Sequence, residues 1–390
     1  MKLPLPFNSR DKFLVLDATP QGVHGLFLSV DEEHALVIEK YAPKMDLEKY
    51  FGRPWRRATQ QAWEGEYLFK DHRKVIAVAD PALATTVSIP VTLVREALDA
   101  KHAITVPELE NLIAQEMAKI FNACRAEAAA RLGVHELDAV LVGEKGRYFK
   151  VDGEAVANPA GFAGKKVTLL LELTFATRGL FEQLSRFFNA PDDFYFAEAP
   201  MARLTAIARV RDLPLALAAA PSLFALKPLR GKEAYPILAQ EPFSWSFEPL
   251  FGRIQEEFGV GRAAAEALYH MYVRGEFSDH AARAFKRAID PEVAELLAES
   301  EKKKCKGSMF IDAPYRLPFE TPYRHGDAVF EDLPLGEVLK SVGFTDLKGG
   351  EGVHGHALSR HLLPFIEAYY DKSNTEINQK LRRRLHWLAA

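Results

Sequence analysis

Short apolar runs alternate with polar positions in the opening part of the chain, which is the pattern of strands and turns. Phe13 to Asp17, Val23 to Val30 and Ala35 to Glu39 each have the length and the side chains of a strand. Residues 18–22 separate the first two runs and contain a proline and a glycine, which favour a turn. The pattern predicts a β-hairpin followed by a third strand.

A long amphipathic helix is predicted to end near Leu132. Thr105-Val106-Pro107-Glu108 has the form of a capping box with a proline in the first turn. Apolar side chains then recur at helical spacing, namely Leu109, Leu112, Ile113, Met117, Ile120, Phe121 and Cys124. We expect this helix to pack on the sheet that the opening strands form.

A second, smaller sheet is predicted near the middle of the chain. Two apolar runs, Ala139 to Val142 and Val167 to Leu173, enclose a polar stretch in which Asp152-Gly153 favours a tight turn. Asn158 to Gly164 follows this turn, and its proline and glycines exclude a helix. The apolar centre of the same segment is unlike a solvated linker, so we expect a structured loop.

This stretch resembles a subdomain of a known protein family. The match covers the run from Tyr148 to Gly153 and then Asn158-Pro159, Gly161, Gly164 and Val167. It looks like the SHS2 subdomain inserted in FtsA, the actin-like protein that tethers the bacterial division ring to the membrane. PilM, a protein of the type IV pilus machinery, is related to FtsA. The resemblance implies an α/β chain with the actin-like ATPase fold, in which two ribonuclease H-like halves carry an inserted SHS2 α+β subdomain.

The resemblance also divides the chain into segments. It assigns residues 1–82 and 176–212 to the first actin-like half, and residues 83–175 to the SHS2-like insertion. Residues 213–370 are expected to form the second half. Residues 371–390 are expected to form a linker and an amphipathic helix.

The first of the family's two phosphate-binding hairpins is degenerate in this chain. The resemblance assigns Asp17, Thr19 and Gln21 to the nucleotide. However, Ala18 stands where the family has a glycine, and Pro20 removes a backbone amide donor. One side of the nucleotide site is therefore only partly preserved.

The second hairpin, expected at Leu215 to Leu226, has lost the aspartate and the glycines of the family pattern. Ala218 occupies the aspartate position, and Ala219-Ala220-Pro221 occupies the glycine turn. Gly349 and Gly350 are the best match to the family's adenosine site. No catalytic residue is assigned, because hydrolysis needs amides around the phosphates and carboxylates for Mg²⁺. The resemblance thus implies ATP or ADP with Mg²⁺ held weakly at most, and no turnover.

The segment from Glu376 to Ala390 has the pattern of a membrane-binding helix. On a helical wheel its apolar side chains form one stripe with a tryptophan at the edge, and its basic side chains are positioned for anionic headgroups. The residues assigned to membrane binding are Ile377, Lys380, Leu381, Arg382, Arg383, Arg384, Leu385, Trp387 and Leu388. A helix docked on the body or on a partner is the alternative.

Composition and charge exclude several classes of protein. A formal net charge of −3 argues against a general nucleic-acid binder. Cys124 and Cys305 lie far apart, and His354, His356 and His361 have no cysteine or suitably spaced carboxylate beside them, so we assign no metal site. No signal peptide and no apolar stretch of ~20 residues is present, which predicts a cytoplasmic protein.

By resemblance, this chain is a cell-division scaffold that links an FtsZ-like tubulin-type filament, and other division proteins, to the inner face of the cell membrane. The expected contacts are the filament, an anionic membrane surface and further copies of the chain in a dimer or homopolymer, with no nucleic acid. Two alternatives stay open. One is a PilM-like adaptor of type IV pilus assembly, and the other is an active actin-fold ATPase.

Overall fold

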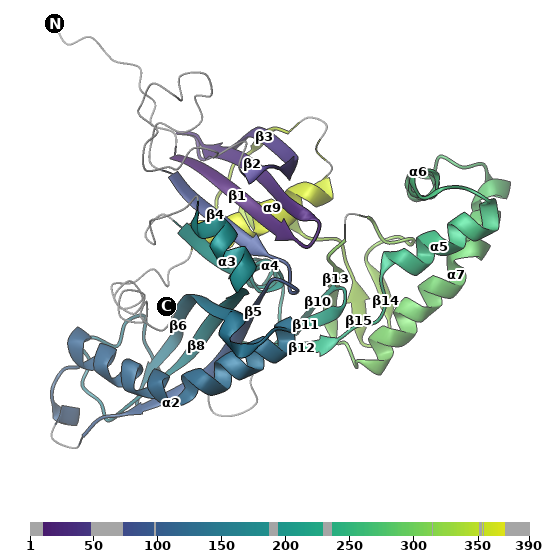
Figure 1. Ribbon diagram of the computed structural model, residues 1–390. Coiled ribbons are helices and arrows are strands. Elements are labelled where there is room, and N and C mark those ends of the chain that lie inside the picture. The colour runs from purple at the N-terminus through teal and green to yellow at the C-terminus, as the bar shows by residue number, and fades with distance from the viewer. Residues whose placement is uncertain are drawn as a thin grey trace, which may run out of the picture.

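A computed structural model describes residues 11–47, 73–96, 99–186, 194–228, 236–313, 315–350, 353 and 355–370. Two six-stranded sheets form the body, and a four-stranded sheet with one long helix forms an insertion (Figure 1). The predicted membrane-binding residues between 377 and 388 lie outside the described residues. None of the described helices is both long and apolar enough to cross a membrane.

The first sheet confirms the predicted opening hairpin and third strand. Its strand order is β16-β3-β2-β1-β4-β9. Strands β1, β2 and β3 pair antiparallel, whereas β4 pairs parallel to β1 and β9 pairs parallel to β4. The strands are β1 (Asp11–Thr19), β2 (Gly22–Val30), β3 (Leu36–Met45), β4 (Arg73–Ala79), β9 (Phe194–Glu198) and β16 (Leu347–Gly349).

The second sheet has the order β12-β11-β10-β13-β15-β14, and its first five strands repeat the directions of β3-β2-β1-β4-β9, whereas β14 pairs antiparallel with β15. Strands β10, β11 and β12 pair antiparallel, and β13 and β15 continue the sheet in parallel. Its strands are β10 (Leu215–Ala219), β11 (Ser222–Pro228), β12 (Pro236–Pro242), β13 (Gly307–Ile311), β14 (Tyr323–His325) and β15 (Ala328–Phe330). This duplicated arrangement is that of two ribonuclease H-like halves, as expected for an actin-like fold.

The two sheets also repeat one detail of the backbone. The amide of Asp80, which follows β4, donates to the carbonyl of Ala18 at 2.8 Å. The amide of Asp312, which follows β13, donates to the carbonyl of Ala218 at the same distance. Each half therefore places an aspartate beside the end of its central strand.

The insertion leaves the first half after β4 and returns before β9. It contains β5 (Ala84–Val94), η4 (Asp99–Lys101), α2 (Val106–Leu132), η5 (Glu136–Asp138), β6 (Ala139–Val151), β7 (Glu154–Ala155) and β8 (Lys166–Thr177). The sheet order is β5-β8-β6-β7, and all neighbours are antiparallel. The predicted turn at Asp152-Gly153 is confirmed, because it connects β6 to β7 and both residues have a positive φ.

The long helix α2 is present as predicted, but it does not pack where we expected. Its buried apolar side chains, such as Ile113 and Phe121, belong to one core with Val91, Leu169 and Phe175 of β5 and β8. The helix thus covers the sheet of the insertion and not the opening sheet (Figure 1). The reason is local, since α2 is joined to β5 and β6 by short connections and the apolar face of that sheet lies nearest.

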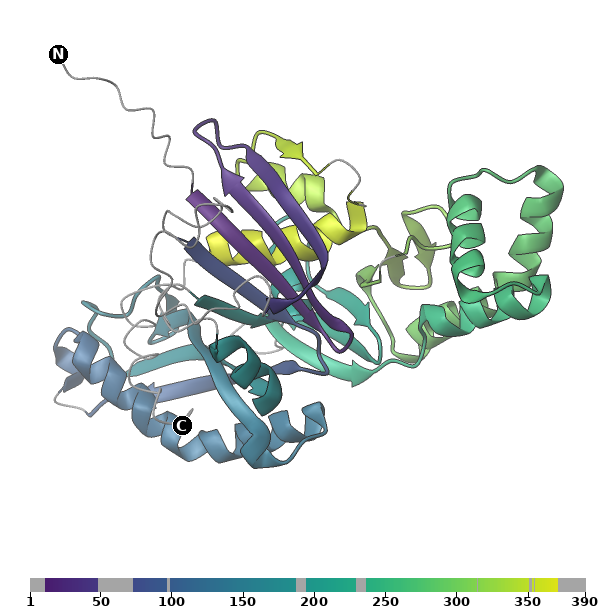
Figure 2. The ribbon, with the colours of Figure 1, turned by 45° about the horizontal axis from the view of Figure 1, so that its top comes forward.

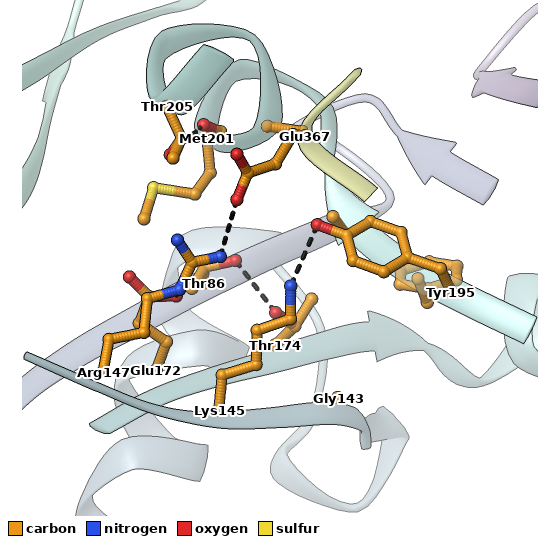
Figure 3. A pocket seen from close by; sticks show the side chains of 13 residues that line it. Thr86, Gly143, Lys145, Arg147, Glu172, Thr174, Tyr195, Met201, Thr205 and Glu367 are labelled. Carbon is orange, nitrogen blue, oxygen red and sulfur yellow. Dashed lines mark hydrogen bonds and ion pairs between the residues drawn. The ribbon is translucent and has the colours of Figure 1, made fainter. Parts of the chain in front are cut away.

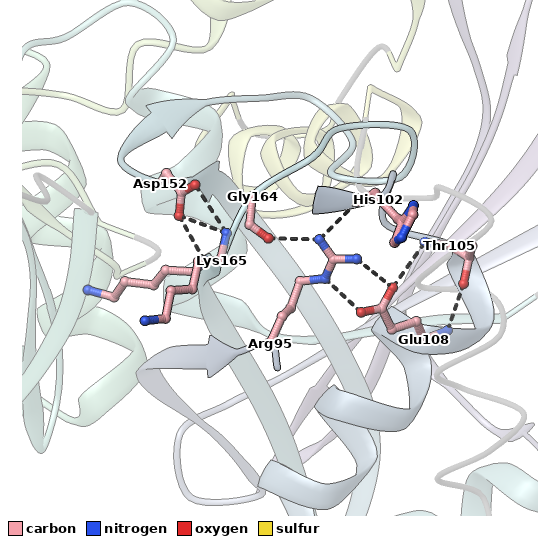
Figure 4. Close-up of polar contacts among 8 residues, drawn as sticks. Arg95, His102, Thr105, Glu108, Asp152, Gly164 and Lys165 are labelled. Carbon is pink, nitrogen blue, oxygen red and sulfur yellow. Dashed lines mark hydrogen bonds and ion pairs between the residues drawn. The ribbon is translucent and has the colours of Figure 1, made fainter. Parts of the chain in front are cut away.

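One buried arginine organises the outer end of the insertion (Figure 4). The Arg95 guanidinium binds both carboxylate oxygens of Glu108, at 2.6 and 3.0 Å, and donates to the carbonyls of His102 and Gly164. Glu108 is also the capping-box residue of α2, because the Thr105 hydroxyl accepts from its amide. The predicted structured loop is therefore fastened to β5 and to the start of α2.

Three helices between β12 and β13 form an arm that projects from the body (Figure 2). They are α5 (Phe247–Phe258), α6 (Arg262–Val273) and α7 (Asp279–Lys302). Aromatic side chains fill the arm, and Phe247, Phe251 and Tyr269 lie in mutual ring contact. The buried side chains of these helices recur at helical spacing, as Leu250 and Ile254 do in α5.

Two helices lie between the six-stranded sheets and join them into one core. Side chains of α4 (Ala199–Ile207) and α9 (Gly355–Tyr369) pack with side chains from both sheets, including Phe13 and Phe310. The remaining helices are α3 (Arg178–Ser185) and α8 (Leu335–Ser341). Since β16 pairs with β3 and α9 packs on β1, the chain returns to the first half before residue 370.

A buried carboxyl group lies where the insertion meets the body. Glu198 ends β9, is fully buried, and accepts a hydrogen bond of 2.7 Å from the amide of Thr86 in β5. Within the described part of the chain, its Oε1 has no hydrogen-bond partner. Burial raises the pKa of Glu198 to about 8, so the carboxyl is mostly protonated at neutral pH.

The raised pKa predicts how a Glu198→Gln variant will behave. The proton on Glu198 stabilises the fold fully below about pH 4.5, and this contribution is lost as the pH rises towards 8. Glutamine does not ionise, so the variant should gain stability over the wild type as the pH rises. The gain is up to about 1.4 kcal/mol for each pH unit between the two pKa values.

Urea unfolding of both proteins at pH 5 and pH 8 measures this difference. The exposed Glu257→Gln is the matched control and should show no such trend. An equal difference between Glu198→Gln and wild type at the two pH values would contradict the assignment.

Candidate functional site

A buried cluster of charged side chains lies between the two halves, where β1 and β13 end. Asp17 belongs to β1 and Asp312 directly follows β13, so each half supplies one carboxylate. Arg203 of α4 binds both, with Nη2 3.2 Å from Asp17 Oδ2 and Nη1 paired with Asp312 Oδ2. Arg360 of α9 is a second bridge, at 3.2 Å from Asp17 and 3.5 Å from Asp312. Two guanidinium groups therefore bridge the two halves, and we call this region between the halves the cleft.

The position of Arg203 follows from the fold. Helix α4 starts directly after β9 and runs between the two sheets, so a central residue of this helix faces both halves. The Arg203 side chain is only 1% exposed, and its Nε and Nη2 also donate to the carbonyl of Arg360 at 3.3 Å. Because a buried guanidinium needs partners for its N–H groups, α4 and α9 are held together at this point.

The charges of the cleft shift the pKa values of its members. Burial opposes ionisation of Asp17, but Arg360 and then Arg203 outweigh it and lower the pKa of this carboxyl to about 2. Burial also opposes the charge on Arg360, and the carboxylates of Asp17 and Asp312 more than compensate, so its pKa is raised. The pKa of Asp80 is raised, mainly by burial. The arginines are thus held in stable ion pairs.

The ion pairs of this cluster oppose the binding of a magnesium nucleotide. A phosphate entering the cleft would have to break the ion pairs at Asp17 and Asp312, and the same carboxylates would repel it. Within the first hairpin, the Thr19 hydroxyl donates to the carbonyl of Gly22 at 2.9 Å, and Gln21 is exposed. We therefore assign no hydrolytic step to the cleft, and weak nucleotide binding stays a prediction.

The structure does not bring Gly349 and Gly350 to the cleft. Gly349 ends β16 at the outer edge of the first sheet, and it pairs with Ile38 of β3. A Cβ atom on Gly349 would lie 2.5 Å from the carbonyl oxygen of Ile38, and its φ of +77° is a left-handed conformation. Close packing of two strands accounts for a glycine here without a nucleotide.

Sequence reasoning missed Arg203, Arg360 and Asp312. Arg203 is the one charged residue of the mostly apolar run from Ala199 to Ile207, a signal that marks a paired buried charge. Asp17 lies near the end of the apolar strand β1, and Asp312 directly follows the apolar strand β13. Strand β13 was not predicted, so Asp312 was missed.

The predicted correspondence of Ala218 with Asp17 is off by one residue. The amides of Asp80 and Asp312 bind the carbonyls of Ala18 and Ala218. Ala218 therefore corresponds to Ala18, and Leu217 occupies the position that corresponds to Asp17.

His361 adjoins the cleft as a structural residue. It is buried, its Nδ1 lies 2.8 Å from the carbonyl oxygen of Ala357, and burial lowers its pKa to about 4. Over the residues that the structure describes, no group of three or more His, Cys, Asp and Glu side chains is arranged to hold a metal ion. His354 and the side chain of His356 lie outside that part.

A groove of about 670 Å³ lies where the insertion, α4, the second sheet and α9 meet. Its lining is mainly apolar and includes Tyr148, Val156, Met201, Leu213, Pro236 and Tyr370. The volume is within the range of sites that bind small molecules or short peptide segments. The groove is separate from the Asp17 cluster, because none of that cluster's four charged residues lines it.

Charged side chains that line one part of the groove, which we call its charged floor, also line a small adjoining cavity, and Figure 3 shows this cavity. Arg147 of β6 binds Glu172 at 3.0 Å and Glu367 of α9 at 2.7 Å, and Arg209 approaches Glu367 at 3.5 Å. In the small cavity, Lys145 donates to the hydroxyl of Tyr195 at 2.9 Å. The network joins the insertion to the body, because Arg147 and Glu367 lie in different units.

Comparison with known proteins gives a likeness at the level of the fold. No family model matches the chain, and no curated protein matches it. Among solved structures, the PilM-PilN type IV pilus biogenesis complex is similar at 14% identity over 91% of this chain and 96% of the other, with a TM-score of 0.43.

Two further structures are similar at lower scores. The cytoplasmic domain of EpsL, an inner-membrane component of the type II secretion system of Vibrio cholerae, has 8% identity over 85% of this chain and 94% of the other, with a TM-score of 0.31. The ethanolamine utilization protein EutJ from Carboxydothermus hydrogenoformans has 10% identity over 93% and 90%, with a TM-score of 0.32. By the duplicated topology of its own two sheets, this chain has the actin-like ATPase fold.

Proposed function

We propose that this chain is a protein-binding adaptor of the actin-like fold that works without nucleotide turnover. The observation that carries the proposal is the pair of arginines, Arg203 and Arg360, between Asp17 and Asp312. Hydrolysis of ATP in such a cleft needs free carboxylates for Mg²⁺ and backbone amides at the phosphates. Here the carboxylates are bound internally, so the two halves are held together by the chain itself.

We further propose that the groove between the insertion and the body binds a short segment of the partner. Its apolar walls offer area to bury, and its charged floor, centred on Arg147 and Glu367, offers directional contacts. A segment from the cytoplasmic part of an inner-membrane pilus or secretion protein is the first candidate. This candidate corresponds to the PilM-like adaptor that the sequence left open as an alternative. Binding such a partner implies that the chain lies at the membrane as a peripheral protein.

A division tether for an FtsZ-like filament is the second candidate. The observation that favours a division tether is the sequence of residues 376–390, which combines an apolar stripe with basic side chains and resembles the membrane helix of FtsA. Both candidates are adaptors, and they differ in the partner. Co-sedimentation with FtsZ filaments, in parallel with binding of pilus-protein segments, separates them.

The first prediction concerns ATP. Phosphate release by the purified protein with Mg²⁺ and ATP should stay at the background rate, and Asp17→Asn should not lower it, because the Asp17 carboxylate is engaged by two arginines. Circular dichroism shows whether the variant is folded. Saturable, Mg²⁺-dependent turnover by the wild type would contradict the proposal by itself, whether or not the variant folds.

The second prediction concerns the groove. Ala157 is exposed and lines the groove, so Ala157→Glu should block a bound segment without disturbing the core. Fluorescence anisotropy with labelled cytoplasmic segments of pilus-assembly proteins should show at least a tenfold loss of affinity, about 1.4 kcal/mol.

Ala263→Glu, on the exposed surface of α6, is the matched control and should bind like the wild type. If Ala157→Glu and Ala263→Glu bind the same segment equally well, the groove is not the binding site.

A further inference from the structure

The segment that follows α9 in the sequence begins at the edge of the groove. Tyr370 lines the groove and directly precedes residues 371–390. We propose that residues 371–390 dock in the groove when neither a partner nor a membrane holds them, and so keep it closed to other segments. This inference rests on the proposed function, because it assigns an internal competitor to the same site.

The groove presents apolar surface that is suited to being covered. Tyr148 is 44% exposed although it is a large aromatic residue, and it lies at a β-bulge where the pairing of β6 with β8 shifts between Arg147 and Lys150. Its φ is +54°, which is unusual for an aromatic side chain. The bulge places Tyr148 in the groove wall while Arg147 pairs with Glu172 and Glu367. Covering this ring would remove apolar area from water.

The segment that follows Tyr370 has a matching pattern. In helical spacing its apolar side chains form one stripe, made of Ile377, Leu381, Leu385 and Leu388 with Trp387 at its edge. The spacer before Ile377 spans roughly 20 Å when extended, so the stripe reaches the groove without strain. A tethered segment also has an effective concentration on the order of millimolar, and a weak intrinsic contact is then enough to fill the site.

Charge near the groove is compatible with this occupant. The charged lining residues are two arginines, Arg147 and Arg209, and two glutamates, so they balance. The exposed Glu154 and Asp212, which lie beside the lining in the sequence, add negative charge near the groove. The segment is basic around Lys380 and between residues 382 and 384. The side chains that would contact the groove are also those that would enter an anionic membrane. Docking and membrane binding therefore exclude each other, and a membrane surface frees the groove.

Hydrogen exchange of the full chain tests the inference. Leu385→Glu places a charge on the apolar stripe, whereas Gln379→Glu places the same charge on the opposite face and is the matched control. We expect the backbone at 146–149 and 156–158 to exchange faster in Leu385→Glu than in wild type, and Gln379→Glu to match wild type. Vesicles of phosphatidylcholine with phosphatidylglycerol, added to wild type, should have the same effect as Leu385→Glu.

Affinity for a partner segment gives an independent readout. If residues 371–390 fill the groove nine-tenths of the time, Leu385→Glu should bind that segment about tenfold more tightly than wild type. Equal exchange in wild type and Leu385→Glu, or equal affinity for the segment, contradicts the docking while leaving the proposed function in place. Faster exchange without binding of any partner segment supports the docking and counts against the proposed function.

Discussion

A buried guanidinium group is costly to remove from water unless carboxylates and carbonyls surround it, and this requirement fixes how the two halves of the chain lie together. Arg203 meets it only where β1 and β13 bring Asp17 and Asp312 to opposite sides of one side chain. In an actin-like fold this is the region between the halves in which charged groups of a nucleotide and its metal are balanced by the protein. In this chain the protein supplies both signs of charge, because Arg203 and Arg360 face Asp17 and Asp312.

Helix α9 connects this cluster to the rest of the molecule. Arg360 near its start belongs to the cleft, and Glu367 near its end binds Arg147 of the insertion and Arg209. The same helix packs against β1 and α4. One helix therefore contacts the cleft through Arg360 and the insertion through Glu367. We infer that the orientation of the insertion is part of the binding site and is not set independently.

The local parts of the fold were readable from the sequence. The capping box at Thr105 and Glu108, the turn at Asp152-Gly153 and the two β-hairpins depend on neighbouring residues, and the structure confirms each of them. The sequence could not show which sheet α2 packs on, because the apolar face of the helix fits either sheet. The connections of α2 to β5 and β6 place it on the sheet of the insertion. The second hairpin has no aspartate, as the sequence indicated, but the structure puts Leu217 and not Ala218 at the position that corresponds to Asp17.

The cleft could not be predicted, because its pairs are remote in the sequence. Arg203 and Asp17 are 186 positions apart, and Arg203 and Asp312 are 109 apart, so no local pattern links them. The role of Gly349 and Gly350 could not be decided from the sequence for a related reason. A glycine that allows two strands to approach closely has the same sequence signature as one that admits a nucleotide.

The most direct test of the account is a double-mutant cycle across the cleft. Urea unfolding would be measured for the wild type, Arg203→Met, Asp312→Asn and the double variant. Each single change leaves the buried cluster with one uncompensated charge and should cost about 3–5 kcal/mol, whereas the double change leaves Asp17 paired with Arg360 and the cluster neutral. We predict that the double variant loses less stability than the sum of the single losses, by at least about 2 kcal/mol. Additive losses would show that these two residues do not hold the halves together.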